Sequence, residues 1–204
     1  MPGPDSRFSV AALSERDRKE SNGELKTIIL DRLTEDSRGT LLDIGGGTGL
    51  LTETLLDVFD RVVVLDSDLR KVEYGAKRRH DVEFIRGSAQ QVPIAGGSVG
   101  TLVSVAAFHH FPDQDAALEE MGRALKPKGR LLLVEIDVTT VRGKLLRFTE
   151  NGLMGGRSKF LAPDRLLEKV RRHRFSDVSL DRTSRGYVVV GTRAPDPGVL
   201  PSGT

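Results

Sequence analysis

The chain has 204 residues and a net charge of +2, with 31 Lys and Arg against 29 Asp and Glu, a length that suits one domain with a sizeable core. It contains no cysteine, which excludes disulfides, thiolate metal sites and a cysteine nucleophile. No stretch approaches the roughly 20 apolar residues of a membrane span, and no signal-peptide pattern opens the chain. We therefore expect a cytoplasmic protein without a metal site.

The two ends of the chain differ in composition from its middle. Residues 1–20 are polar and charged and are interpreted as an N-terminal arm. A capping box over Ser21–Glu24 then predicts the start of a helix. The main domain is expected over residues 21–193, and the Gly-, Pro- and Ser-rich residues 194–204 predict a disordered tail.

The most informative stretch is Leu41–Leu50, which reads LLDIGGGTGL. An apolar strand ends at Asp43, and four glycines within five positions then turn the chain into an expected helix. Glycine permits φ > 0 and lets a ligand approach the backbone. Because the first N–H groups of a helix are unpaired, they point at such a ligand. This arrangement predicts a nucleotide-like cofactor.

The residues around the glycines indicate which cofactor it is. A dinucleotide fold needs Gly-x-Gly-x-x-Gly, and the third glycine is replaced here by Leu50. Asp43 would repel a pyrophosphate but would attract the ammonium of an amino acid. With no phosphate-binding Lys in the loop, the pattern favours a nucleoside joined to an amino acid, which is S-adenosylmethionine.

Strands and helices then alternate along the chain. Arg61–Asp66 is a β-branched run that ends in an acid about 20 residues after the glycines, where an acceptor for a ribose diol is expected. Further strands are predicted at 82–86, 101–105 and 129–135, with helices between them. The alternation favours a parallel sheet covered on both faces. Two final strands, at 177–181 and 186–191, predict a hairpin.

These motifs resemble the class I S-adenosylmethionine-dependent methyltransferases over residues 41–136 and 160–193. Their first motif, (Asp/Glu)-x-Gly-x-Gly-x-Gly, is filled here without a gap. Leu125–Gly129 is similar to the late motif Leu-Lys-Pro-Gly-Gly of the small stand-alone enzymes that include ubiquinone/menaquinone-biosynthesis C-methyltransferases. The resemblance implies an α/β fold with a Rossmann-like, doubly wound, seven-stranded sheet, parallel except for the antiparallel last strand of the C-terminal hairpin. It also implies that residues 1–20 act as a lid, although a mobile arm is an equal alternative.

The resemblance further implies a set of cofactor-binding residues: Asp43, Gly45, Gly47, Thr48, Gly49, Asp66, Ser67, Ser88, Ala89 and Val105. The chain departs from the family pattern at two positions. Ser88 stands where the adenine-contacting motif has an acid, which puts the cofactor affinity in doubt because a hydroxyl is a weaker partner. Gly100 stands where an acid is common at the start of the fourth strand.

The acceptor side of the site is less specific. His109 and His110 follow the fourth strand, where an imidazole can take a proton from a substrate; packed loop anchors are the alternative. Residues 137–159 are interpreted as a variable segment that caps the substrate. Within it, 141–148 is either an amphipathic piece that lines the pocket or touches a membrane, or an ordinary helix on the sheet. Together these features favour a small-molecule or lipid-like acceptor.

Two other functions stay open at this point. Basic clusters at 77–80 and 169–174 are typical of helix C-termini but also suit an RNA or protein substrate. There is no Trp, however, and no Asn-Pro-Pro-Tyr-like tetrapeptide follows the fourth strand, so nucleic acid is only an alternative. Ser88 and Gly100 are the basis for the other alternative, a protein that binds the cofactor without turnover.

Overall fold

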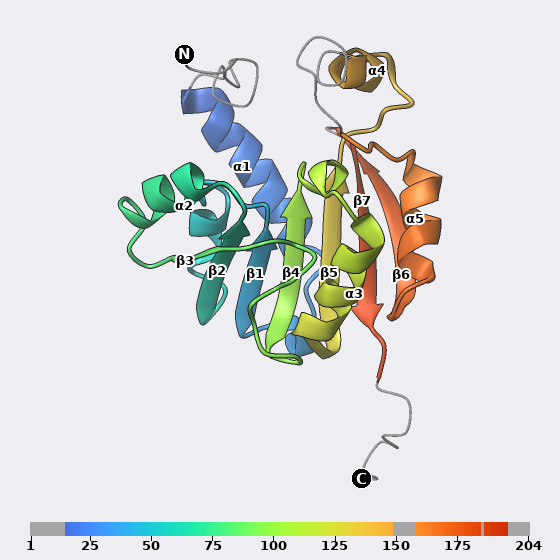
Figure 1. Ribbon diagram of the computed structural model, residues 1–204. Helices are drawn as coiled ribbons and strands as arrows, with labels where there is room; N and C mark the ends of the chain where they lie inside the picture. Colours follow the sequence, from blue (N-terminus) through green and yellow to red (C-terminus); the bar gives the residue numbers. More distant parts are fainter. Residues whose placement is uncertain (1–14, 149–157, 185, 196–204) are drawn as a thin grey trace.

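The computed structural model describes residues 15–148, 158–184 and 186–195 (Figure 1). Most of the predicted arm, residues 149–157 of the predicted capping segment and nearly all of the predicted tail therefore lie outside the described residues. Within the described ranges, no helix is long and apolar enough to cross a bilayer.

Seven strands form one sheet in the order β3-β2-β1-β4-β5-β7-β6. The strands are β1 (Thr40–Ile44), β2 (Arg61–Asp66), β3 (Glu83–Arg86), β4 (Val99–Val105), β5 (Leu125–Glu135), β6 (Phe175–Thr183) and β7 (Gly186–Arg193). Pairing is parallel from β3 to β5, and β7 runs antiparallel to both of its neighbours. The predicted fold class, with its terminal hairpin, is confirmed.

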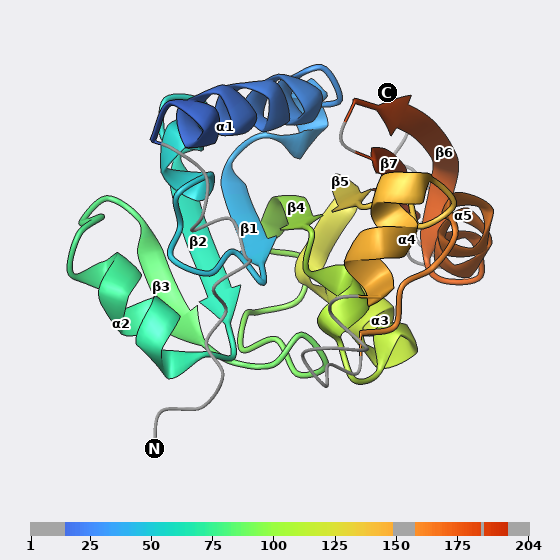
Figure 2. The same ribbon diagram turned by 90° about the horizontal axis from the view of Figure 1, so that it is seen from above.

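Helices cover both faces of this sheet (Figure 2). They are α1 (Glu15–Leu30), α2 (Leu69–Ala76), α3 (Gln114–Ala124) and α5 (Pro163–Arg171), whereas α4 (Val141–Phe148) lies beyond one end of the sheet. Successive strand residues point to opposite faces, so Leu41 packs in the layer beneath α1, whereas Leu42 packs beneath α3 and α5. Two buried apolar layers result, one on each side of the sheet.

The topology predicts the edge of the sheet at which a ligand would bind. The chain builds outward from β1 to β3 and then returns to β4 on the other side of β1. In such open sheets a ligand binds where the order reverses, outside the carboxyl ends of the strands. That edge is at the top of Figure 1, where α4 also lies.

One local prediction was wrong, and the structure adds detail to two others. Ser21 is buried inside α1, so the capping box does not start this helix. The glycines lead into the predicted helix, which is a short 3-10 helix, Thr52–Leu55, and the Thr52 side chain donates a hydrogen bond to Asp43. Of the two interpretations of residues 141–148, an ordinary helix packed on the sheet does not fit α4, since Leu145 and Phe148 are exposed.

Candidate cofactor site

The glycine loop leaves β1 in a conformation that side chains rarely adopt. Gly45, Gly47 and Gly49 have φ values of 81°, 61° and 75°, in the left-handed region that favours glycine. A Cβ on Gly45 would stand 2.5 Å from the Cβ of Ala107, and one on Gly49 would stand 2.7 Å from the Phe84 ring. The first and third of these glycines are thus required by packing as well as by backbone conformation.

Gly47 differs from Gly45 and Gly49 because no atom would clash with a Cβ at this position. The nearest atoms to a Cβ built there are Lys71 Cδ at 3.7 Å and Asp66 Oδ2 at 3.9 Å. A Cβ at Gly47 would therefore make only ordinary van der Waals contacts, one of them with the Asp66 carboxylate. A ligand that approaches Asp66 would lie against this part of the backbone.

Asp43 is a buried acid whose pKa is shifted by its surroundings. Its side chain is buried, Oδ2 accepts a hydrogen bond from Thr52 Oγ1 at 2.5 Å, and Oδ1 is buried with no hydrogen-bond partner among the described residues. Burial raises the pKa of the Asp43 carboxyl to about 6; the bond from Thr52 opposes this change and the nearby charge of Asp66 adds to it. A buried carboxylate with one unsatisfied oxygen suits a cationic partner such as an ammonium group.

Asp66 connects the end of β2 to the glycine loop. Its Oδ2 accepts a hydrogen bond from the Gly47 N–H at 3.0 Å, and its Oδ1 accepts one from the Asp68 N–H at 2.8 Å. Each carboxylate oxygen has a second lone pair, so Asp66 can still accept from a ribose hydroxyl. The two acids predicted to bind the cofactor thus flank one loop.

The predicted adenine-side residues follow β3. The Gly87 N–H donates to the Asp66 carbonyl at 3.1 Å, which holds this turn against the end of β2. Ser88 is exposed and its hydroxyl donates to the Gln90 side chain, whereas Ala89 is buried. Of the remaining predicted residues, Thr48 and Val105 are half-buried and Ser67 is exposed. Their roles in binding stay predictions.

The two histidines have different surroundings. His109 is only 2% exposed, its Nδ1 lies 2.6 Å from Glu135 Oε2, and its ring stacks on Phe160 at 4.1 Å between centroids. Glu135 also accepts the Phe108 N–H at 2.9 Å through Oε1. His110 is exposed, with Nδ1 3.0 Å from the Ser158 hydroxyl. His109 is thus part of a buried cluster, whereas His110 is exposed.

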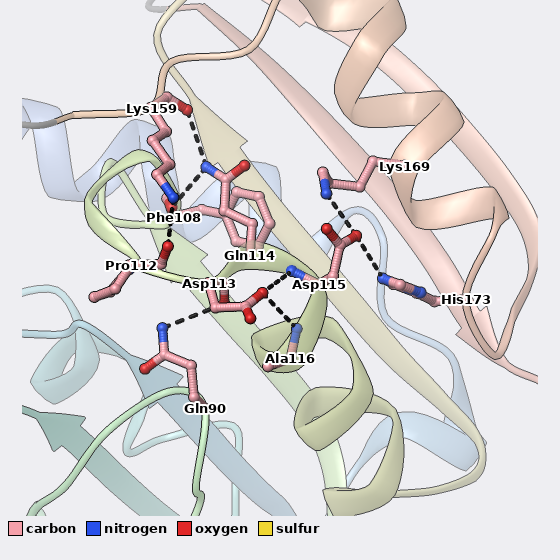
Figure 3. A network of polar contacts seen from close by, with 10 residues as sticks. All are labelled: Gln90, Phe108, Pro112, Asp113, Gln114, Asp115, Ala116, Lys159, Lys169 and His173. Atoms are coloured by element: carbon pink, nitrogen blue, oxygen red, sulfur yellow. Dashed lines mark hydrogen bonds and ion pairs between the residues drawn. The ribbon is translucent and has the colours of Figure 1, made fainter.

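Polar contacts attach this loop to the segment before α5 (Figure 3). Gln114 Nε2 donates to the carbonyls of Phe108 at 3.2 Å and Lys159 at 2.9 Å. Lys159 in turn donates from its backbone N–H to the His109 carbonyl at 2.6 Å. The position of the histidine loop therefore depends on a contact with Lys159, which lies 50 positions away from His109 along the chain.

Sequence reasoning missed two residues of the site and left one without explanation. Thr52 and Glu135 are the missed partners of Asp43 and His109; Glu135 had a signal, since it ends a strand as Asp66 does. Gly100 now has a physical reason: a Cβ there would stand 2.2 Å from the Arg38 carbonyl oxygen. It lies near the start of β4, at the edge of the sheet opposite the glycine loop, so the missing acid does not alter this site.

Comparisons with known proteins agree with this arrangement. The profile of a family described as methyltransferase domain matches residues 42–133. A demethylmenaquinone methyltransferase of Paenarthrobacter aurescens is 33% identical over 110 residues, which are 54% of this chain and 44% of that enzyme. Another, from Thermotoga maritima, is 27% identical over 170 residues, with 72% of this chain and 74% of that enzyme covered. The chain thus matches less than two thirds of the first enzyme.

A solved structure shares the fold over most of the chain. It is a methyltransferase from Thermotoga maritima that depends on S-adenosylmethionine, and it superposes with a TM-score of 0.73 at 20% identity, over 86% of this chain and 90% of that one. The matched domain and the shared fold thus make this chain similar to the class I S-adenosylmethionine-dependent methyltransferases, and the cofactor that this similarity implies is S-adenosylmethionine.

Proposed function

We propose that the protein transfers a methyl group from S-adenosylmethionine to a small-molecule or lipid-like acceptor with a sizeable nonpolar part. The observation that carries the proposal is the pair of acids around the glycine loop. Asp43 offers a buried, unsatisfied oxygen, and Asp66 accepts a hydrogen bond from the Gly47 N–H, at a position that a Cβ would not crowd. The names of relatives such as demethylmenaquinone methyltransferase support a nonpolar acceptor.

Each residue of the site has one part in this proposal. Asp43 would hold the ammonium of the methionine half, and Asp66 would accept from the ribose hydroxyls. The turn with Ser88 and Ala89 would face the adenine. When bound, S-adenosylmethionine supplies a methyl group activated by its sulfonium, and its in-line transfer depends largely on positioning.

The histidines would act next to this site, at the carboxyl end of β4. His110 is the member of the pair that an acceptor can reach, and it is the proposed general base where the acceptor must lose a proton. His109, paired with Glu135 and stacked on Phe160, would hold the loop that presents His110.

The basic clusters give little support to an RNA or protein substrate. Lys169 Nζ donates to Asp115 at 2.5 Å, and the neighbouring Arg172 pairs with Glu168. In the other cluster Arg79 donates to Glu53 at 2.9 Å. These cations are engaged within the chain, which leaves less charge for a phosphate backbone.

Methyl transfer with tritium-labelled cofactor tests the proposal. Purified protein is supplied with a demethylated quinone, total RNA or a protein extract, and the label is counted in each fraction. We expect label in the quinone fraction, with turnover falling by about 100-fold in His110→Ala but unchanged in His80→Ala, an exposed histidine of the 77–80 cluster. Label only in RNA or protein would refute the acceptor class. Cofactor binding without any transfer would favour the non-catalytic alternative.

A further inference from the structure

Helix α4 exposes a row of apolar side chains. Val141, Leu145 and Phe148 are 84%, 64% and 65% exposed. Among the described residues, the other large exposed apolar side chains are Leu50, Leu69 and Tyr74, each between 42% and 49% exposed. Single exposed apolar residues are normal, but three on one short helix indicate a contact surface.

The side of α4 opposite the apolar row contacts the domain and so fixes the orientation of the helix. Positions 141, 145 and 148 are spaced i, i+4 and i+7, which places them within an arc of about 60° on a helix of 3.6 residues per turn. Gly143 lies on the far side of that helix. A Cβ there would stand 2.0 Å from the Asp137 carbonyl oxygen, so the backbone of α4 is pressed against the segment after β5. The apolar row therefore points away from the body of the protein.

The attachment of α4 to the domain is also well defined. The Thr140 hydroxyl accepts from the Gly143 N–H at 3.1 Å and donates to the Asp137 carbonyl at 2.7 Å. The Asp137 carboxylate accepts from Thr139 and pairs with Arg182 of β6. These contacts hold the first turn of the helix against the sheet edge and keep the apolar row on the outside.

Two cations lie on one side of the apolar row. Lys144 and Arg147 are exposed, and the helix sequence VRGKLLRF contains no acid. By the same helical spacing, both cations lie between the apolar row and the side that carries Gly143. An apolar edge bordered by cations is the pattern of a helix that lies in the surface of an anionic bilayer.

We propose that α4 docks the protein on the surface of an anionic lipid bilayer, with Val141, Leu145 and Phe148 entering the apolar region and Lys144 and Arg147 meeting lipid phosphates. A second copy of the chain fits this face less well, because a two-fold contact would bring the same cations toward each other. Because α4 lies at the carboxyl edge of the sheet (Figure 1), docking would turn the glycine-loop edge toward the lipid. The inference goes beyond the proposed function and stands on α4 alone.

Vesicle sedimentation tests the docking surface. The full chain, without cofactor or acceptor, is mixed with phosphatidylcholine vesicles that either contain or lack phosphatidylglycerol. We expect binding to the anionic vesicles, reduced about fivefold for each cation removed in Lys144→Glu and Arg147→Glu. The double variant Leu145→Ser/Phe148→Ser should bind at least about tenfold more weakly. Far-UV circular dichroism melts check that each variant folds.

Matched controls come from exposed residues of other helices. Leu69→Ser in α2 and Arg165→Glu in α5 should bind as the wild type does. Wild-type protein that stays in the supernatant with anionic vesicles, or a double variant that sediments fully, would overturn the proposal. A dimer that the double variant abolishes, without vesicle binding, would assign the face to a second copy instead. Since no cofactor is present, none of these outcomes depends on methyl transfer.

Discussion

Asp43→Asn is expected to weaken binding of S-adenosylmethionine at least tenfold. The same variant should raise the free energy of unfolding at neutral pH, because it removes a buried charge. Loss of a hydrogen bond to a charged group costs about 1.5–3 kcal/mol, which corresponds to the expected loss of affinity. The amide oxygen of the variant can still accept from Thr52, so the local structure should be kept. Calorimetric titration of both proteins measures the change in affinity.

The difference in free energy of unfolding between Asp43→Asn and the wild type should increase with pH. The folded-state pKa of Asp43, about 6, exceeds the ordinary aspartate value of 3.8, so the folded protein holds a proton that the unfolded chain has released. The wild type therefore loses stability as pH rises from 3.8 to about 6, by roughly 2–3 kcal/mol in all. The variant lacks this loss, and its free energy of unfolding relative to the wild type should rise by that amount between pH 4 and pH 7.5.

An exposed acid provides the control. A hydrogen bond from Lys26 holds the pKa of Asp57 below its usual value, so any pH dependence in Asp57→Asn has the opposite sign and ends at acidic pH. Its affinity for S-adenosylmethionine should not change. If Asp43→Asn instead binds the cofactor normally, and its relative stability is constant with pH, then Asp43 is not the buried partner of the ammonium.

Gly47→Ala is expected to lose cofactor affinity by more than tenfold with only a modest loss of stability. A Cβ at this position meets no atom closer than 3.7 Å, so the folded protein has room for it. The left-handed φ of 61° should cost roughly 1–2 kcal/mol of folding free energy. The added methyl group, however, would occupy the space in front of Asp66 in which the cofactor is proposed to lie.

Gly97→Ala separates these two effects. Gly97 has a φ of 68° and no atom within 4 Å of a built Cβ, and it lies before β4, away from the glycine loop. Both variants should lower the melting temperature by similar amounts, but only Gly47→Ala should lose binding. Equal affinity in the two variants would mean that the cofactor does not lie against Gly47.

Much of the fold could be predicted from local patterns. The β-branched run Arg61–Asp66 and the apolar run in 129–135 became the expected strands, because a buried parallel strand has a continuous apolar sequence. The acids Asp43 and Asp66 were predicted to face the cofactor from their places near strand ends. Their position at one loop follows from the parallel sheet, in which the carboxyl ends of strands meet.

The features that were missed depend on contacts between distant segments. The capping box at Ser21 is a local pattern, but α1 already forms on both sides of it and buries that serine. The pairing of His109 with Glu135 and the stacking on Phe160 join segments 26 and 51 residues apart. Gly100 appeared as a lost acid, and only the approach of the Arg38 carbonyl explains the glycine.

Calorimetric titration of the wild-type chain with S-adenosylmethionine, S-adenosylhomocysteine and NAD tests the central claim most directly. Asp43 beside the loop, and Leu50 in place of the third dinucleotide glycine, should let both adenosyl ligands bind and should reject NAD. Binding of both adenosyl ligands without added metal, and no heat with NAD, is the predicted result. Binding of NAD with no heat from either adenosyl ligand would contradict the account.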